Sequence, residues 1–126
     1  MNKFLLSWGM VFAYVIFNSF GALIIKHEIN KFGEVQFHSF RLIVGYFFAL
    51  LKSPLILCGI LSIFLSAFVW MMALSRLQIS LAYPVAVGLN FGIVVTAGLI
   101  LLREPLSLEK IIGITLIFVS IILLSK

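Results

Sequence analysis

The residues best suited to bind a ligand are uncharged polar and aromatic side chains inside long apolar runs. They are Tyr14, Asn18, Trp70, Tyr83 and Asn90. An amide within such a run must find hydrogen-bond partners, because hydrocarbon supplies none. We therefore expect Asn18 and Asn90 to point into a helix bundle or a wet cavity. Two roles stay open for these amides: hydrogen bonds that hold helices together, or the lining of a ligand site.

The acidic residues all lie at the ends of the apolar runs or between them. They are Glu28, Glu34, Glu104 and Glu109, and the sequence contains no Asp. A proton relay inside a membrane usually depends on an ionisable group there, and no apolar run carries one at its middle. No nucleophile–base pair or phosphate-cradling glycine loop is present, so we expect neither enzyme activity nor a cofactor. His27 lies at the end of an apolar run and His38 on the segment 37–51, so the two do not form a metal site, and no metal is expected.

The composition indicates that lipid surrounds most of the chain. Of its 126 residues 63% are hydrophobic and 10% charged, and the mean hydropathy is +1.27. A soluble domain of this size has too much surface to hide so many apolar side chains. The nine Lys and Arg are scattered at the ends of the apolar runs, as membrane anchors are, so we expect no nucleic-acid partner. The sequence predicts a multi-pass protein of the cell membrane, with membrane lipid as its partner.

The apolar runs predict an all-α fold that forms a single transmembrane domain over residues 1–126. A helix that crosses a hydrocarbon core ~30 Å thick needs about 20 mostly apolar residues. Four runs meet this length, and the polar stretch 29–36 is predicted to be a loop. The predicted spans are residues 4–25, 54–75, 79–102 and 106–125.

Residues 37–51 are the ambiguous segment. His38, Arg41, Gly45 and Ala49 follow helical spacing, so the polar and small residues share one face, and phenylalanines cover much of the rest. The pattern predicts an amphipathic helix that is interfacial or re-entrant. A short fifth span is the alternative.

The basic residues are unevenly divided between the two membrane surfaces. The first and third connections together hold six, and the other side holds three. With four spans, the positive-inside rule places the first and third connections in the cytoplasm. The bias is modest, so insertion in both orientations stays open. The six are Lys26, Lys31, Arg41, Lys52, Arg103 and Lys110, and the three are Lys3, Arg76 and Lys126.

Several short motifs in the last 50 residues or so carry a family resemblance. They are LAYP at 81–84, LNF at 89–91, EPLS at 104–107 and then Gly113. This string resembles the second half of the drug/metabolite transporter superfamily, with its EamA-like members. Within the superfamily it is most similar to the small four-helix branch. That branch includes the small multidrug resistance proteins and the paired subunits proposed to flip undecaprenyl phosphate–aminoarabinose.

The resemblance implies a fold and an assembly. Three helices would line a substrate cavity, with Tyr83 on the family's cavity tyrosine and Trp70 near its cavity tryptophan. The fourth helix would dimerise, giving a homodimer or a heterodimer with a homologous subunit. The residues that match the family's dimer stripe are Gly113, Leu116, Ile117, Ser120 and Ile121, with Ser120 where a glycine is usual.

Asn18 marks a departure from the drug exporters of this family. Those exporters carry a glutamate midway along their first helix, and alignment on Lys26 places Asn18 at that position. An amide does not exchange a proton near neutral pH. The substitution argues against proton-coupled cation export.

The sequence therefore favours a transporter or flippase subunit for an amphipathic, lipid-linked substrate of the polyprenyl-phosphate sugar type. The five polar and aromatic residues named first would bind the substrate. Basic residues at the rim would hold a phosphate headgroup, although the same residues also serve as topology anchors. The rim residues are Lys26, Arg41, Lys52 and Arg103. Two alternatives remain open: a polyspecific exporter of cationic or aromatic compounds, and an assembly partner that transports nothing.

Overall fold

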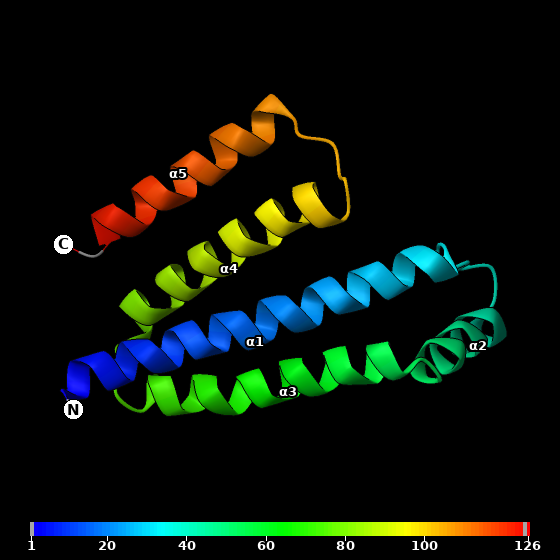
Figure 1. The fold of residues 1–126 in the computed structure, drawn as a ribbon, viewed down its shortest axis with the longest axis horizontal. Coiled ribbons are helices and arrows are strands. Elements are labelled where there is room, and N and C mark those ends of the chain that lie inside the picture. Colours follow the sequence, from blue (N-terminus) through cyan, green and yellow to red (C-terminus); the bar gives the residue numbers. More distant parts are fainter. Residues whose placement is uncertain (1, 125) are drawn as a thin grey trace.

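The computed structural model describes residues 2–124 and 126, and within them the chain is all-helical, as predicted (Figure 1). Residues 1 and 125, the first of the predicted domain and the last of the predicted fourth span, lie outside the described part. The helices are α1 (Lys3–Phe32), α2 (Phe40–Leu51), α3 (Pro54–Leu74), α4 (Ile79–Leu101) and α5 (Leu108–Leu124).

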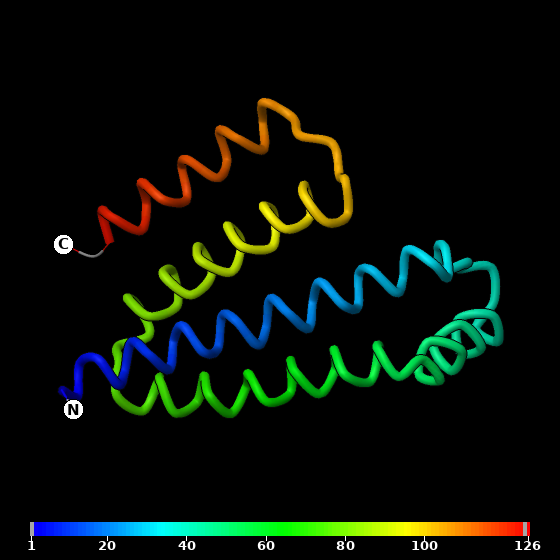
Figure 2. The backbone as a smooth tube through the Cα atoms, viewed as in Figure 1, coloured from blue at the N-terminus to red at the C-terminus, as the bar shows by residue number. Residues whose placement is uncertain are grey.

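The helices form an up-and-down bundle built around the pair α1 and α3. These two helices share the most extensive contact, α4 packs on α1, and α5 packs on α4. The tube in Figure 2 shows α1, α3, α4 and α5 running back and forth, with α2 at the end where α1 finishes and α3 begins. The N-terminus of α1, the α3–α4 turn and the C-terminus of α5 therefore lie at the opposite end.

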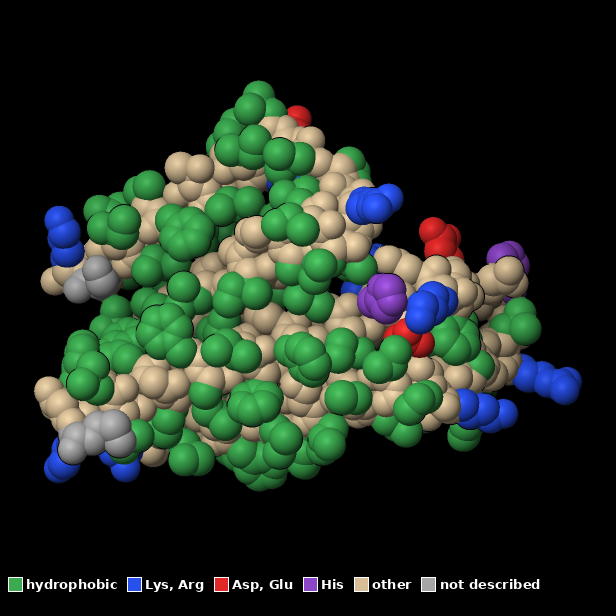
Figure 3. Space-filling model, viewed as in Figure 1, with side chains coloured by type: hydrophobic (Ala, Val, Ile, Leu, Met, Phe, Trp, Pro, Cys, Tyr) green, Lys and Arg blue, Asp and Glu red, His purple; other side chains and the backbone are tan. Residues whose placement is uncertain are grey.

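Three helices, α1, α3 and α4, are long and apolar enough to cross a membrane. The 17 residues of α5 rise about 26 Å, and the 12 of α2 about 18 Å, against a core of ~30 Å. The count of four spans stays a prediction, and α2 is short for a fifth. Figure 3 shows hydrophobic side chains along the helices and the charged ones gathered toward the ends, as a lipid-embedded chain requires.

The predicted loop at 29–36 is wrong in its first half, because α1 continues to Phe32. Glu28 accepts a hydrogen bond from Lys31 Nζ at 2.8 Å, one turn along the helix. It also accepts one from Ser53 Oγ at 3.0 Å, at the start of α3. These polar contacts stabilise another turn of helix where the sequence pattern indicated an end. Gly33, with φ +81°, then ends the helix in a conformation that suits glycine.

The amphipathic segment forms a helix that begins later than predicted, at Phe40 instead of residue 37. The side chain of Ser39 caps it by accepting the Leu42 backbone N–H at 3.3 Å. The Tyr46 hydroxyl donates to the Gly33 carbonyl at 2.7 Å. Two residues, Lys52 and Ser53, connect Leu51, the last residue of the helix, to Pro54, the first of α3. The hydrogen bond of Tyr46 and this short connection therefore hold α2 beside the end of α1.

Two glycines set the spacing between α1 and α3. A Cβ atom added to Gly21 would lie 2.6 Å from the Gly59 carbonyl oxygen. One added to Gly59 would lie 2.8 Å from Ile25 Cγ1 and 3.0 Å from the Gly21 carbonyl oxygen. Small residues allow helix backbones to approach closely, which is how helices gain packing energy in lipid. The sequence analysis did not single out this contact.

Candidate functional site

Three aromatic side chains meet where α1, α3 and α4 converge. The ring centroids of Tyr14 and Trp70 are 4.8 Å apart with an interplanar angle of 36°. Those of Trp70 and Tyr83 are 6.2 Å apart at 58°. These separations lie within the range of favourable aromatic pairs. Trp70 therefore lies in the bundle between two tyrosines, one from each neighbouring helix.

Next to the aromatic cluster, the two expected amides meet each other. Asn18 Nδ2 donates to Asn90 Oδ1 at 3.2 Å. The Ser19 hydroxyl donates to the same oxygen at 2.7 Å. Asn90 Oδ1 thus accepts two hydrogen bonds. Asn90 Nδ2 and Asn18 Oδ1 make no hydrogen bond with the described residues, and both side chains are only half-buried.

The aromatic cluster and the amide pair form one continuous strip. Tyr14 and Asn18 are four residues apart on α1, about 6 Å along the helix axis. The strip rests on a core of small aliphatic side chains contributed by α1, α3 and α4. We call these residues, with Ser19, the polar strip: Tyr14, Asn18, Ser19, Trp70, Tyr83 and Asn90. The structure brings together all five expected binding residues, and Ser19 joins them although it was not among those expected.

Ser19 illustrates what the sequence alone leaves undecided. A serine in an apolar helix commonly bonds to a backbone carbonyl one turn back, and Ser62 of α3 instead reaches the Phe17 carbonyl of α1 at 2.7 Å. Ser19 is buried and bonds to a side chain on another helix. Only its position directly after Asn18 links it in sequence to the amide pair.

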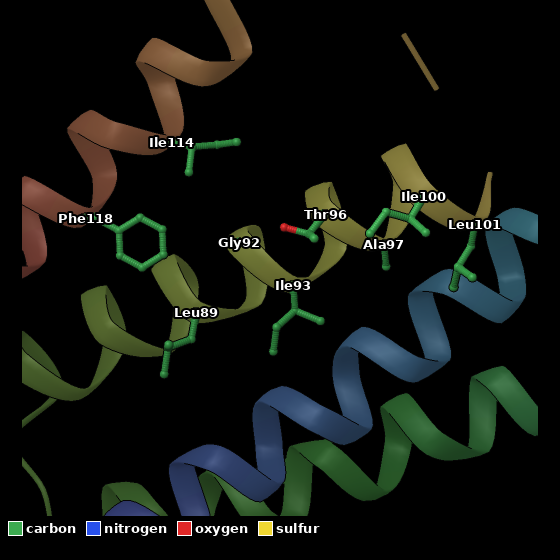
Figure 4. A pocket seen from close by; sticks show the side chains of 9 residues that line it. All are labelled: Leu89, Gly92, Ile93, Thr96, Ala97, Ile100, Leu101, Ile114 and Phe118. Atoms are coloured by element: carbon green, nitrogen blue, oxygen red, sulfur yellow. The ribbon is translucent and has the colours of Figure 1, made fainter. Parts of the chain in front are cut away.

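An apolar groove of about 610 Å³ lies along α4, on the side that faces α5 (Figure 4). Thr96 provides its only side-chain hydroxyl among the lining residues. Gly92 opens its middle, since a Cβ there would lie 3.2 Å from Phe118 Cζ of α5. The groove contains no residue of the polar strip, although Leu89 at its edge directly precedes Asn90.

The four expected rim residues lie at one end of the bundle but not in one cluster. Lys26 lines a hollow of about 520 Å³ with Gly33 and Tyr46. Arg41 lines another, beside Glu34 and Tyr46. Lys52 follows α2, and Arg103 follows α4. All four glutamates occupy this same end, so the rim is mixed in charge.

The expected dimer stripe on α5 is divided by the packing within the chain. Ile117 and Ile121 pack against Gly88 of α4. Leu116 is 61% exposed, Ser120 is exposed, and no atom lies within 4 Å of the place where a Cβ on Gly113 would stand. In this chain α5 therefore keeps one face on α4 and leaves the other uncovered.

The structure thus places neutral polar side chains between the apolar helices of a small bundle. The family model for the Small Multidrug Resistance protein matches residues 46–117, which is more than half of the chain. The chain belongs to that family. It is a multi-pass protein of the cell membrane and a small transporter or flippase subunit, as the sequence predicted.

Individual relatives cover the chain to different extents. A protein of Pseudomonas savastanoi pv. phaseolicola, named probable 4-amino-4-deoxy-L-arabinose-phosphoundecaprenol flippase subunit ArnE, is 26% identical over 96% of this chain and 98% of its own. The protein of that name from Pseudomonas aeruginosa is 31% identical over 62% of this chain and 67% of its own. An uncharacterized protein y4nH of Sinorhizobium fredii is 39% identical over 43% of this chain and 46% of its own. No solved structure gives a significant match.

Proposed function

We propose that this protein is a flippase subunit that moves an amphipathic, lipid-linked anion of the polyprenyl-phosphate sugar type across the membrane. It spans the membrane four times and works as a dimer, with itself or with a homologous subunit. It has no enzyme activity, and it recognises its substrate without an acidic group in the membrane. The observation that carries the proposal is the neutral polar strip, in which two amides bond to each other on the same helices as three packed aromatic rings.

The strip has the chemistry that a sugar headgroup needs. Sugar hydroxyls both donate and accept hydrogen bonds. Asn90 Nδ2 offers a donor and Asn18 Oδ1 an acceptor, and neither atom bonds to any residue that the structure describes. The aromatic faces of Trp70 and Tyr83 offer an apolar surface against which the C–H face of a sugar ring can pack. A carboxylate in the same position would instead favour a cation.

The groove on α4 suits the hydrocarbon part of such a substrate. Its lining is almost wholly apolar, and it lies on the same helix as Tyr83 and Asn90. An amphipathic molecule can then place its headgroup on the strip and its tail along α4. The names of the relatives, which describe probable flippase subunits for an aminoarabinose-phosphoundecaprenol, support this substrate class.

The openness of the strip supports a dimer. Tyr83 is 55% exposed in the single chain, and α5 buries no residue. A substrate with polar groups would meet lipid on that side unless a second subunit covered it. We therefore place a partner subunit over the open side of the strip. The uncovered face of α5, with Gly113, Leu116 and Ser120, is a separate surface on which we also expect a subunit contact.

Arg103 offers a clean test of the rim. Its φ of 54° is in the left-handed region that favours glycine, so Arg103→Gly removes the charge and relieves the backbone at once. We expect the variant to keep its thermal stability and to bind an anionic lipid about fivefold more weakly, since a basic residue near the surface contributes about 1 kcal/mol. Lipid binding by native mass spectrometry measures this, with Lys126→Gln as the control. Unchanged binding would show that Arg103 does not bind the lipid headgroup.

The proposed function is tested in proteoliposomes that hold the purified protein, alone and with a co-expressed homologous subunit. A fluorescent polyprenyl-phosphate sugar is supplied in one leaflet, and its appearance in the other is followed by chemical quenching. We expect protein-dependent translocation of this lipid. Failure with both samples would contradict the proposal.

The family match also supports a second candidate, an exporter of cationic or aromatic compounds. The same vesicles loaded with a cationic dye distinguish the two. Dye efflux without lipid translocation would favour the exporter. Asn18, in place of a mid-helix glutamate, is the residue that argues against it.

A further inference from the structure

The end of the bundle opposite the rim carries positive charge without any acidic side chain. Lys3 begins α1 and Arg76 lies in the α3–α4 turn, so both stand at the ends of helices long enough to cross a membrane. All four glutamates lie at the other end. On the face shown in Figure 3, basic side chains appear at both ends, and acidic ones only at the end that holds α2 and the α4–α5 connection.

Lys3 and Arg76 line one pocket, although they are 73 positions apart in sequence. The pocket measures about 520 Å³ and is otherwise lined by Phe4, Ser7 and Leu77. Neither basic side chain makes an ion pair or a hydrogen bond with the described residues. At the rim, by contrast, Lys31 is bound to Glu28. Among the described residues, therefore, no glutamate competes for the two charges of this pocket.

Other features of this end complete the pocket. The helix dipoles do not decide its charge preference, because the N-termini of α1 and α4 and the C-termini of α3 and α5 all lie there. The cap residue of α4, Gln78, makes no side-chain hydrogen bond to its first turn. The buried Ser7 hydroxyl donates to the Lys3 carbonyl at 2.8 Å, which holds the first turn of α1 in place. Phe4 and Leu77 give the pocket an apolar wall.

We infer that Lys3 and Arg76 form a phosphate-binding site at this end of the bundle. The depth of the site, at the ends of candidate spans, is the depth of lipid headgroups. A lipid phosphate and a free phosphate share the chemistry that two cations recognise. The inference deepens the proposed function. If the protein moves a lipid-linked phosphate across the membrane, this pocket is the headgroup site at the end of the bundle opposite the rim, and that role alone rests on the proposed function.

The site is tested by titrating the full-length protein in a neutral detergent with three probes. These are dihexanoyl phosphatidic acid, inorganic phosphate and, as a phosphate-free lipid, dihexanoylglycerol. We expect Lys3→Gln and Arg76→Gln each to weaken phosphate binding about fivefold, and the double variant about 25-fold. Lys126→Gln removes a charge at the same end but outside the pocket, and should change the affinity less than about twofold.

The three probes distinguish a lipid phosphate from free phosphate as the ligand. Tight binding of the phosphatidic acid alone, lost in the double variant, would assign a lipid phosphate. Equal binding of inorganic phosphate, lost in the same way, would assign a site for phosphate from either source. The charge-conserving pair Lys3→Arg and Arg76→Lys should retain binding, which separates loss of charge from loss of fold.

Unchanged affinity in the double variant, or an equal loss in Lys126→Gln, would overturn the inference. Because binding is measured without transport, the result is independent of the translocation assay. If the protein binds phosphate here but moves no lipid, the phosphate site is supported and the proposed function is contradicted.

Discussion

Replacing Asn90 with leucine is expected to slow lipid translocation by about 10-fold to 100-fold. Asn90 Oδ1 accepts hydrogen bonds from both Asn18 and Ser19. Leucine has a similar size, but it leaves these two donors without a partner in an apolar surrounding, which costs about 1–3 kcal/mol. It also removes Nδ2, the donor left for substrate. The rate in proteoliposomes measures the effect.

The matched control for this variant is Asn30→Leu. Asn30 is exposed near the end of α1, outside the polar strip and beside Lys26 in the rim hollow. Its replacement removes no bond of the amide pair, so the rate should stay within about twofold. Equal rates for Asn90→Leu and the unaltered protein would show that the amide pair only holds helices together, or does nothing, in transport.

Asn90→Asp gives a sharper version of the same test. A protonated aspartic acid has nearly the shape of asparagine and keeps its accepting oxygen. An ionised carboxylate, by contrast, brings a charge into an apolar surrounding, which is costly unless the charge is paired. We expect this variant to be slow where the carboxyl is ionised and to recover as the pH falls. Asn90→Leu should show no such recovery.

Replacing Gly59 with leucine is expected to destabilise the bundle more than any single change on the lipid-facing surface. The Cβ alone would lie 2.8 Å from Ile25 Cγ1 and 3.0 Å from the Gly21 carbonyl oxygen. The backbone of α1 cannot yield without separating from α3. Overpacking of this kind costs about 1–3 kcal/mol, and more where backbone is involved. Thermal unfolding in detergent, followed by size-exclusion chromatography, should show a lower midpoint.

Gly9→Leu is the control for the Gly59 change. A Cβ added there would meet no atom within 4 Å beyond its chain neighbours and the nearby backbone of its own helix, and Gly9 is also within a candidate span, α1. We expect its unfolding midpoint to stay close to that of the unaltered protein. If both leucine variants unfold alike, close approach at Gly59 does not hold α1 and α3 together.

The apolar runs predict most of the fold because span length is set by membrane thickness. The starts of α3 and α4 agree with the predicted ones, and their ends lie one residue earlier. The end of α1 was placed too early, because the polar residues after Lys26 find partners in three dimensions. Glu28 accepts a hydrogen bond from Ser53, the cap residue of α3, a contact that no local pattern contains.

The membership of the site was largely predictable, but its geometry was not. An amide in an apolar run must be satisfied, so Asn18 and Asn90 stand out in the sequence. That they bond to each other, and that Ser19 shares the acceptor, depends on how α1 and α4 are placed together. The contact of Gly21 with Gly59 has the same origin, since no spacing of glycines along α1 or α3 marks it in the sequence.

The central claim is that this transporter recognises a polar headgroup with neutral amides, and needs no titratable acid within the membrane. It is tested most directly by translocation of a fluorescent polyprenyl-phosphate sugar in proteoliposomes, with and without an imposed pH gradient. The account predicts the same rate in both conditions. A rate that collapses when the gradient is removed would contradict it.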